Sequence, residues 1–207
     1  MGFTESDDHV RARMSDVITY VVLAGGAGAR LGLDKATVRL GGVSLLERLV
    51  GSLPIAPMVI GPEVGGGPVA AIEVACSGVT STWIGLLAVD MPFAAPVIAH
   101  LAAMIEPTSM DGLVPLDKAD RMQWLSGLYR TESLRGALRD MGETRNQSMR
   151  TLMSTLVLEP IALPDELAGL LMDIDTPRDL ALAQVFAAAL QGRQTGDATR
   201  RAYRVDF

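Results

Sequence analysis

A nearly continuous run of apolar and β-branched residues at positions 17–24, closed by Gly25 and Gly26, constrains the fold more than any other feature of this chain. A strand without polar alternation has to be covered on both faces, which is typical of parallel sheets with helices on either side. Residues 57–60 and 82–89 form two further buried runs. The sequence therefore predicts a central, doubly covered sheet.

Helix signals lie between and after these runs. Ser44 precedes Glu47 by three residues, so each side chain can bond the other's backbone amide in a capping box. Thr176 is predicted to cap a last helix, opened by Pro177 with Asp179 in its first turn, that runs to about residue 190. Further helices are expected at 68–76, 96–105, 133–139 and 149–156, and shorter strands at 111–115 and 123–129.

This alternation predicts a single-domain α/β fold with a mostly parallel sheet, right-handed crossovers and helices on both faces. The 207 residues suffice for one ordinary domain of this kind, and the chain has no internal repeat or interdomain linker. We expect a flexible N-terminal extension at 1–15, the domain at 16–190, and a polar, Arg-bearing C-terminal tail at 191–207.

Charge and composition exclude several classes of protein. A net charge of −6 has the wrong sign for a general nucleic-acid binder held by phosphate contacts. No apolar run approaches the roughly twenty residues needed to cross a bilayer. Cys76 is the only cysteine, which excludes an intramolecular disulfide and favours a reducing compartment. We therefore expect a cytoplasmic protein without a nucleic-acid or membrane partner, as a monomer or weak homo-oligomer.

The loop after the first strand, residues 23–35, concentrates the candidate chemistry. Its glycines do not fit the G-x-G-x-x-G dinucleotide fingerprint, and Lys35 lacks the neighbours of a P-loop lysine. Glycines still allow backbone amides to converge on phosphate oxygens, and Arg30 and Lys35 add positive charge. Spacing alone does not separate a triphosphate site from a plain turn with two solvated cations.

The sequence LAGGAGARLGLDK at 23–35 resembles the L-A-G-G-x-x-x-R-x-G-x-D-K motif of the molybdenum cofactor guanylyltransferase-like nucleotidyltransferases. Three further blocks follow in the family's order: GGPVAA at 66–71, VDMPF at 89–93 and DIDTPRDL at 173–180. The four blocks span nearly the whole predicted domain. The resemblance implies a Rossmann-like three-layer α/β/α sandwich of the nucleotide-diphospho-sugar transferase type.

The resemblance also implies a reaction, in which a phosphate attacks the α-phosphorus of a nucleoside triphosphate and pyrophosphate leaves with Mg²⁺ assistance. GTP and a molybdopterin-type phosphate are the implied substrates, with Arg30, Lys35 and Asp90 as catalytic residues. Such transfer depends mainly on positioning and charge, and needs no protein nucleophile. The implied nucleotide-binding residues are Leu23, Ala24, Gly25, Gly26, Lys35, Gly67 and Asp90.

Two carboxylates are the expected metal ligands. Asp90 follows a buried strand, at the end where open α/β sheets bind ligands, although it could instead cap the next helix. Asp175 fills the family's second N/D position and is the expected second ligand. Asp173 competes for that role, and both could serve only turn and capping chemistry.

The chain departs from the family pattern in two places. Only residues 61–64 separate the second buried strand from the glycine turn at 65–67, where relatives place an Asn, another strand and an acidic residue that help recognise the base. Glu63 is a candidate replacement. We expect a modest preference for GTP over ATP and CTP, because fewer polar groups would be left unpaired by the wrong base. The family's His-Pro is replaced by Gln123-Trp124, which leaves the acceptor open.

Four hypotheses follow. The first is transfer from GTP to molybdopterin, and the second is the same chemistry with another triphosphate or acceptor, such as CTP, a sugar phosphate or phospholactate. The third is a non-catalytic nucleotide-binding relative. The fourth is a partner protein whose Arg-rich tail docks on an acidic surface.

Overall fold

The computed structural model describes residues 17–25, 38–106 and 108–202, with side chains as far as residue 190. Its main sheet contains β1 (Ile18–Leu23), β4 (Met58–Ile60), β5 (Trp83–Ala88), β6 (Gly112–Pro115), β7 (Leu128–Arg130) and β8 (Leu158–Ile161). The strand order is β4-β1-β5-β7-β6-β8, and β7 alone runs antiparallel to its neighbours in this sheet. The predicted mostly parallel α/β sheet is confirmed.

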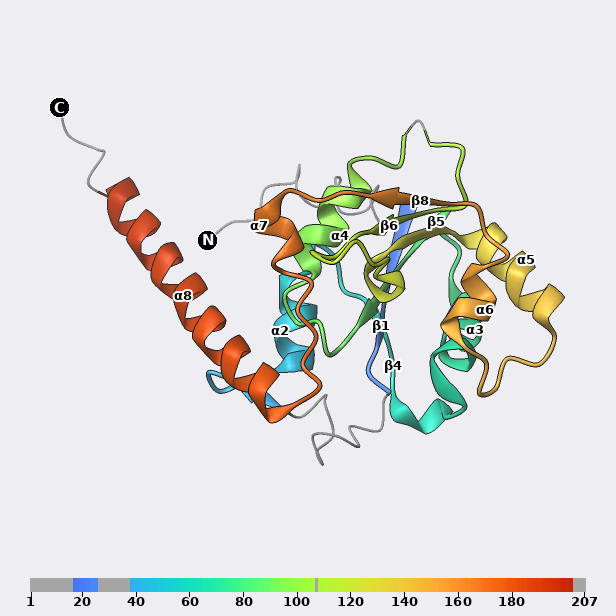
Figure 1. Ribbon diagram of the computed structural model, residues 1–207, viewed down its shortest axis with the longest axis horizontal. Coiled ribbons are helices and arrows are strands. Elements are labelled where there is room, and N and C mark those ends of the chain that lie inside the picture. The colour runs from blue at the N-terminus through green and yellow to red at the C-terminus, as the bar shows by residue number, and fades with distance from the viewer. Residues whose placement is uncertain (1–16, 26–37, 107, 203–207) are drawn as a thin grey trace.

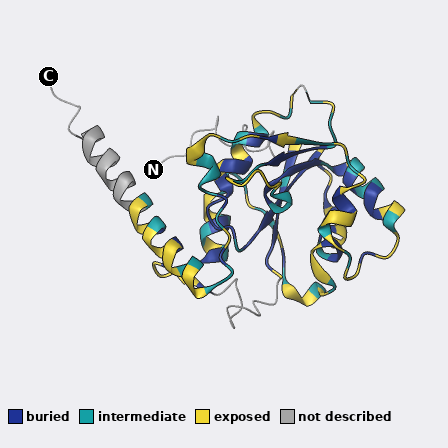
Figure 2. Cartoon of the chain, in the orientation of Figure 1, coloured by how far each residue is buried: buried dark blue, intermediate teal, exposed yellow. Residues whose placement is uncertain are grey.

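Helices cover both faces of the sheet (Figure 1). They are α2 (Leu45–Ser52), α3 (Gly67–Gly78), α4 (Ala95–Ala102), α5 (Thr131–Met141), α6 (Met149–Met153), α7 (Asp165–Ala168) and α8 (Pro177–Ala202). Tyr20 and Val22 pack into the core shared with α2, α4 and α8. Val21 and Leu23 pack into the core shared with α3, α5 and α6. Successive residues of β1 thus face opposite helical layers, which explains the continuous apolar run, and Figure 2 shows the sheet buried between them.

Both predicted caps are present. Glu47 N–H donates to Ser44 Oγ at 3.1 Å, and Ser44 N–H donates to Glu47 Oε2 at 2.9 Å. At the start of α8, Thr176 N–H donates to Asp179 Oδ2 at 2.8 Å and Asp179 N–H donates to Thr176 Oγ1 at 3.2 Å. These reciprocal bonds satisfy amides that have no partner inside the helix.

The strand predicted at 123–129 is wrong in its first half. Trp124–Ser126 forms the 3₁₀ turn η2, and only Leu128–Arg130 pairs as a strand. Ser126 N–H donates to the Gln123 carbonyl at 3.0 Å, which closes the turn, and Tyr129 Oη donates to the Trp124 carbonyl at 2.7 Å. A buried tyrosine hydroxyl needs such a partner, and the turn supplies it.

Helix ends also differ from the prediction. The helix expected at 96–105 ends at Ala102, because Met104 N–H bonds the Leu101 carbonyl at 2.9 Å in a tighter turn. The helix expected to stop near residue 190 continues to Ala202, and Figure 1 shows the far end of α8 extending away from the sheet. The expected extension at 1–15 lies outside the described residues, and the division at 16–190 and 191–207 stays a prediction.

The structure adds elements that the sequence did not predict. A hairpin of β2 (Arg39–Leu40) and β3 (Val43–Ser44) precedes α2. A 3₁₀ turn, η1 (Pro62–Val64), links β4 to α3. The short helix α7 and the parallel edge strand β8 complete one side of the sheet.

Gly85 in β5 should be intolerant of a side chain. A Cβ there would lie 2.7 Å from Tyr20 Cδ1, in a fully buried strand. We expect Gly85→Ala to destabilise the fold by about 1–3 kcal/mol, the usual cost of overpacking. Gly51→Ala is the matched control, since nothing lies within 4 Å of a Cβ there, and removing a helix glycine stabilises by about 0.5–1 kcal/mol. Urea unfolding of both variants measures the change in the free energy of unfolding, which should be negative for Gly85→Ala and positive for Gly51→Ala.

Candidate functional site

The carboxyl ends of β1, β4 and β5 meet at one edge of the sheet. Ala24 N–H donates to the Ile60 carbonyl at 2.8 Å, and Val89 N–H donates to the Leu23 carbonyl at 3.1 Å. Leu23 and Ala24 are buried, whereas Gly25 is exposed. A Cβ on Gly25 would lie 3.2 Å from Pro62 Cα. The glycine therefore lets the end of β1 approach the β4 turn closely and leaves its backbone open to a ligand.

Asp90 follows β5 at this edge and is half-buried. Ile174 N–H donates to the Asp90 backbone carbonyl at 2.9 Å, which fastens the segment before α8 to the turn after β5. Asp175 is the next residue and is also half-buried, whereas Asp173 is exposed. The structure thus brings Asp90 and Asp175 to the same part of the sheet edge, across 85 positions of sequence.

The side chains of Asp90 and Asp175 were alternatively expected to cap the helices that follow them, and the structure shows other caps. The N-cap of α4 is Ala94, with no side-chain cap bond, so Asp90 does not cap that helix. Thr176 and Asp179 supply the side-chain cap of α8, while Asp175 contributes its backbone N–H, which donates to Asp179 Oδ2 at 3.3 Å. The capping interpretation of Asp90 is therefore wrong.

These two carboxylates suit a hard cation. Within the described ranges, no three or more His, Cys, Asp or Glu side chains are grouped to hold a metal ion. Mg²⁺ keeps several waters and commonly binds through one or two carboxylates plus substrate phosphates. Two half-buried carboxylates, one after β5 and one before α8, fit that donor set.

Three predicted site residues, Gly26, Arg30 and Lys35, lie outside the described residues. Gly67 is the first residue of α3 and has a φ of +86°. It follows Gly65 and Gly66, with φ values of +61° and +74°, so three consecutive residues adopt left-handed backbone that favours glycine. The glycine turn therefore presents the amino end of α3 at the same edge.

One contact to the glycine turn was missed by sequence reasoning. Residues 142–146, the first part of the loop joining α5 to α6, pack on it: Asn146 N–H donates to the Gly66 carbonyl at 2.6 Å. A Cβ on Gly66 would lie 3.2 Å from Arg145 Cγ. No local pattern signals this contact, because the two segments are far apart in sequence.

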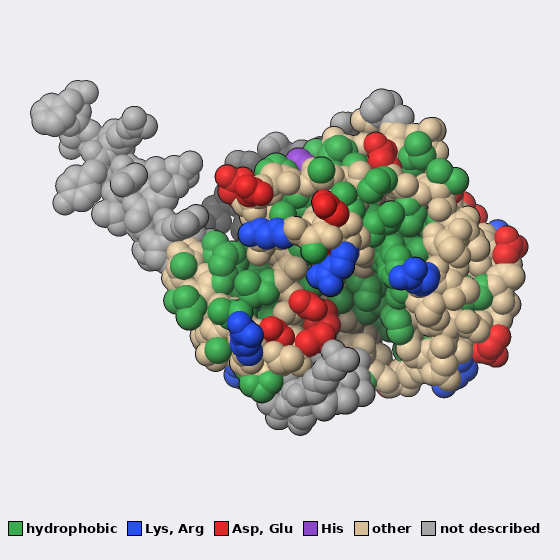
Figure 3. All heavy atoms as spheres, in the orientation of Figure 1, with side chains coloured by type: hydrophobic (Ala, Val, Ile, Leu, Met, Phe, Trp, Pro, Cys, Tyr) green, Lys and Arg blue, Asp and Glu red, His purple; other side chains and the backbone are tan. Residues whose placement is uncertain are grey.

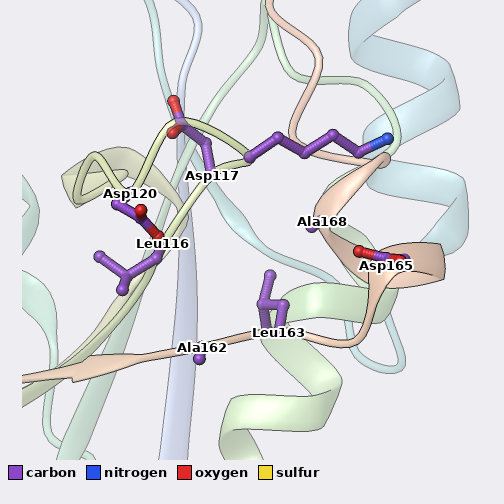
Figure 4. A pocket seen from close by; sticks show the side chains of 8 residues that line it. Leu116, Asp117, Asp120, Ala162, Leu163, Asp165 and Ala168 are labelled. Atoms are coloured by element: carbon purple, nitrogen blue, oxygen red, sulfur yellow. The ribbon is translucent and has the colours of Figure 1, made fainter.

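Two adjoining hollows lie at the carboxyl ends of β6 and β8. One, of about 490 Å³, is shown in Figure 4: Leu116, Asp117 and Asp120 line it from the segment after β6, and Leu163, Asp165 and Ala168 from the segment after β8. The other, of about 340 Å³, shares Asp117, Lys118 and Ala168 and continues to Leu171 and Met172. Met172, which lines the second hollow, directly precedes the Asp173–Asp175 segment in the chain. Figure 3 shows acidic and basic side chains together near the middle of the face that it presents.

Asp117 organises the loop at these hollows. Burial raises the pKa of this carboxyl, but hydrogen bonds outweigh it and hold the pKa at about 2. The donors are the Arg121 backbone and guanidinium, the Ala119 N–H and the Gln123 amide. Gln123, which stands where relatives have His-Pro, thus fixes a loop at the edge of the hollow. The Asp117 carboxylate stays charged and fully engaged.

The helices in the described part of the chain are each too short or too polar to cross a bilayer. Cys76 is a buried free cysteine on α3, and burial raises the pKa of its thiol to about 11. An un-ionised thiol of this kind is a poor nucleophile. Cys76 therefore belongs to the core.

Comparison with known proteins gives a consistent family. The MobA-like NTP transferase domain family matches residues 52–161. The probable molybdenum cofactor guanylyltransferase of Mycobacterium avium (strain 104) is 33% identical over 193 residues, which cover 81% of this chain and 95% of that protein. The protein of the same name from Opitutus terrae is 28% identical, covering 80% and 94%.

Solved structures share the fold. Molybdopterin-guanine dinucleotide biosynthesis protein A from Archaeoglobus fulgidus superposes with a TM-score of 0.67 at 23% identity, covering 83% of this chain and 99% of that one. The 2-C-methyl-D-erythritol 4-phosphate cytidylyltransferase of Thermus thermophilus has a TM-score of 0.59 at 15% identity, covering 83% and 99%.

Proposed function

This chain belongs to the MobA-like NTP transferase family, and we propose that it transfers GMP from GTP to a molybdopterin-type phosphate and releases pyrophosphate. The names of its curated relatives support this choice of substrates. The observation that carries the proposal is the bond from Ile174 N–H to the Asp90 carbonyl. It joins the backbones of two segments that carry Asp90 and Asp175, at the edge where Gly25 leaves its backbone exposed.

For this reaction the protein mainly has to position the two substrates and stabilise negative charge. The acceptor phosphate is already ionised at neutral pH, so its oxygen can attack the α-phosphorus in line as the bond to pyrophosphate breaks. Arg30 and Lys35 would neutralise the triphosphate and the departing pyrophosphate. Their assignment rests on the 23–35 motif.

We further propose that Asp90 and Asp175 hold Mg²⁺. The ion would supply positive charge at the triphosphate oxygens when bound. Asp175 is preferred to Asp173 because it is half-buried and immediately follows Ile174, the residue bonded to Asp90. The side chains would also fix where the triphosphate lies relative to β1 and β5.

We place the acceptor in the two hollows at the ends of β6 and β8. Their combined lining reaches the residues just before Asp173, on the carboxylate side of the edge. Asp117, Asp120 and Asp165 line the larger hollow together with Lys118, which is exposed and is the cation of that lining that could meet an acceptor phosphate. Its Nζ would lie 3.7 Å from a Cβ at Gly169, so it extends across the hollow toward the end of α7.

A second candidate is the same transfer with CTP or another acceptor. It is favoured by the short 61–64 link, which lacks base-recognising residues that relatives have, and by the fold shared with a cytidylyltransferase. A panel of GTP, CTP, ATP and UTP with molybdopterin, followed by pyrophosphate release, tests both. Faster pyrophosphate release with GTP than with the other triphosphates supports the proposal, and faster release with CTP supports the second candidate. Nucleotide binding without pyrophosphate release would support a non-catalytic relative.

We also propose a cellular location and an oligomeric state for the protein. A cytoplasmic setting agrees with the single, buried, free Cys76. The Arg-bearing tail at 191–207 stays a candidate partner arm, which removal of the tail and pull-down would test. A monomer or weak homo-oligomer is expected.

A further inference from the structure

The 142–146 loop is fastened to α3 and to the glycine turn at two points. Thr144 is 3% exposed, and its hydroxyl donates to Glu73 Oε2 on α3 at 2.5 Å. Asn146 N–H donates to the Gly66 carbonyl at 2.6 Å. Between these two bonds the backbone has little freedom, so the position of Arg145 relative to the glycine turn is set.

Arg145 lies over that turn. A Cβ on Gly66 would be 3.2 Å from Arg145 Cγ and 3.3 Å from its Cβ, so the aliphatic stem packs on the glycine. A Cβ on Gly65 would be 3.7 Å from Arg145 Nη2, so the guanidinium reaches past Gly66. Beside it, a hollow of about 480 Å³ is lined by Val64, Ala70, Glu73, Val74 and residues 142–145.

Charges of both signs meet at this place, since Glu73 and Glu143 line the hollow beside Arg145, whose side chain is exposed. Gly66 is the N-cap of the twelve-residue helix α3 and makes no side-chain cap bond. A helix amino end carries partial positive charge, so an acceptor between it and the Arg145 guanidinium would interact favourably with both. Among the described residues, Arg145 has no carboxylate within ion-pair distance, although its backbone N–H donates to Glu143 Oε1 at 2.9 Å.

The glycine turn and the candidate metal ligands lie on opposite sides of β1. β1 lies between β4 and β5, and the candidate metal ligands follow β5 and precede α8. The glycine turn follows β4 and η1, on the opposite side of β1. We take the base of a triphosphate bound beside Asp90 to lie on the glycine-turn side of β1, because the family pattern places its base-recognising residues in the segment that the 61–64 link shortens.

We propose that Arg145 contacts the base, and that the 142–146 loop replaces the recognition residues missing from the 61–64 link. This rests on the proposed function. A guanidinium offers two parallel donors that match O6 and N7 of a 6-oxopurine, whereas adenine presents an amino donor in place of O6. Arg145 is therefore a specificity residue for guanine and hypoxanthine over adenine.

Equilibrium binding of GTP, ITP and ATP to the full chain with Mg²⁺ tests this. One bidentate contact predicts that the chain prefers GTP and ITP to ATP by about 10- to 100-fold. Arg145→Ala should lower GTP and ITP affinity by that factor and leave ATP affinity essentially unchanged. Arg145→Lys should behave like Arg145→Ala, because a lysine keeps the charge but not the two-donor fork.

Arg150→Ala is the matched control, an exposed arginine on α6 that should leave all three affinities unchanged. Equal losses for all three nucleotides, or rescue by Arg145→Lys, would assign Arg145 to the phosphates and overturn the proposal. So would a wild-type chain without purine preference, or an Arg145→Ala variant that binds normally. These are binding measurements, so they stand apart from pyrophosphate release, on which the proposed function depends.

Discussion

An Asp90→Asn variant is expected to turn over about 10²- to 10³-fold more slowly at fixed Mg²⁺, because metal charge stabilisation contributes several kcal/mol to such a transition state. Asparagine keeps the size of the side chain but removes the negative charge that a hard cation prefers. Asp175→Asn should act in the same direction. The measurement is initial rate against Mg²⁺ concentration, in which both variants should need more metal.

Asp173→Asn is the control for this pair, because Asp173 is exposed and lies two positions before Asp175. It should retain the wild-type Mg²⁺ titration. Thermal unfolding of all three variants establishes that the fold is intact. An Asp90→Asn variant with an unchanged Mg²⁺ titration would remove the metal assignment, and a loss confined to Asp173→Asn would move the second ligand to that residue.

The second large effect concerns Lys35. If it neutralises the triphosphate, Lys35→Ala should lower turnover about 10²- to 10³-fold, the usual result of removing one preorganised charge or donor at a transition state. Nucleotide binding should weaken too. Thermal stability should change little, since the sequence predicts Lys35 in a loop and a surface lysine contributes little to folding.

Lys118→Ala provides a lysine-to-alanine control. Lys118 lines the hollows proposed for the acceptor, so its loss should leave GTP binding unchanged in the absence of acceptor. Near-normal kinetics in Lys35→Ala would exclude the triphosphate role. Equal weakening of GTP binding in both variants would mean that the effect is one of general surface charge.

Local signals in the sequence predicted the parts of the fold that depend on neighbouring residues. The apolar run at 17–24 predicted β1 because it is covered on both faces, and the Ser44 and Glu47 pair predicted the start of α2 because a capping box needs only four residues. Asp90 was predicted as a metal ligand from its position after a buried strand together with the family resemblance, and Asp175 from the resemblance alone. The structure adds the bond that places them together.

Features that depend on distant contacts could not be predicted. The turn at 124–126 replaces a strand because it forms where Tyr129 needs a partner for its hydroxyl. Arg145 belongs to the site only because Thr144 and Asn146 bond to α3 and Gly66, more than seventy residues earlier in the chain. A single sequence carries no local trace of such pairings.

The most direct test of the central claim follows the α-phosphate of GTP. The full chain is incubated with α-labelled GTP, molybdopterin and Mg²⁺, and labelled products are separated. We expect label in a molybdopterin dinucleotide, one pyrophosphate released for each dinucleotide formed, and no labelled dinucleotide when the acceptor is omitted. Label in free GMP, label that stays in GTP despite tight binding, or transfer from CTP but not GTP would contradict it.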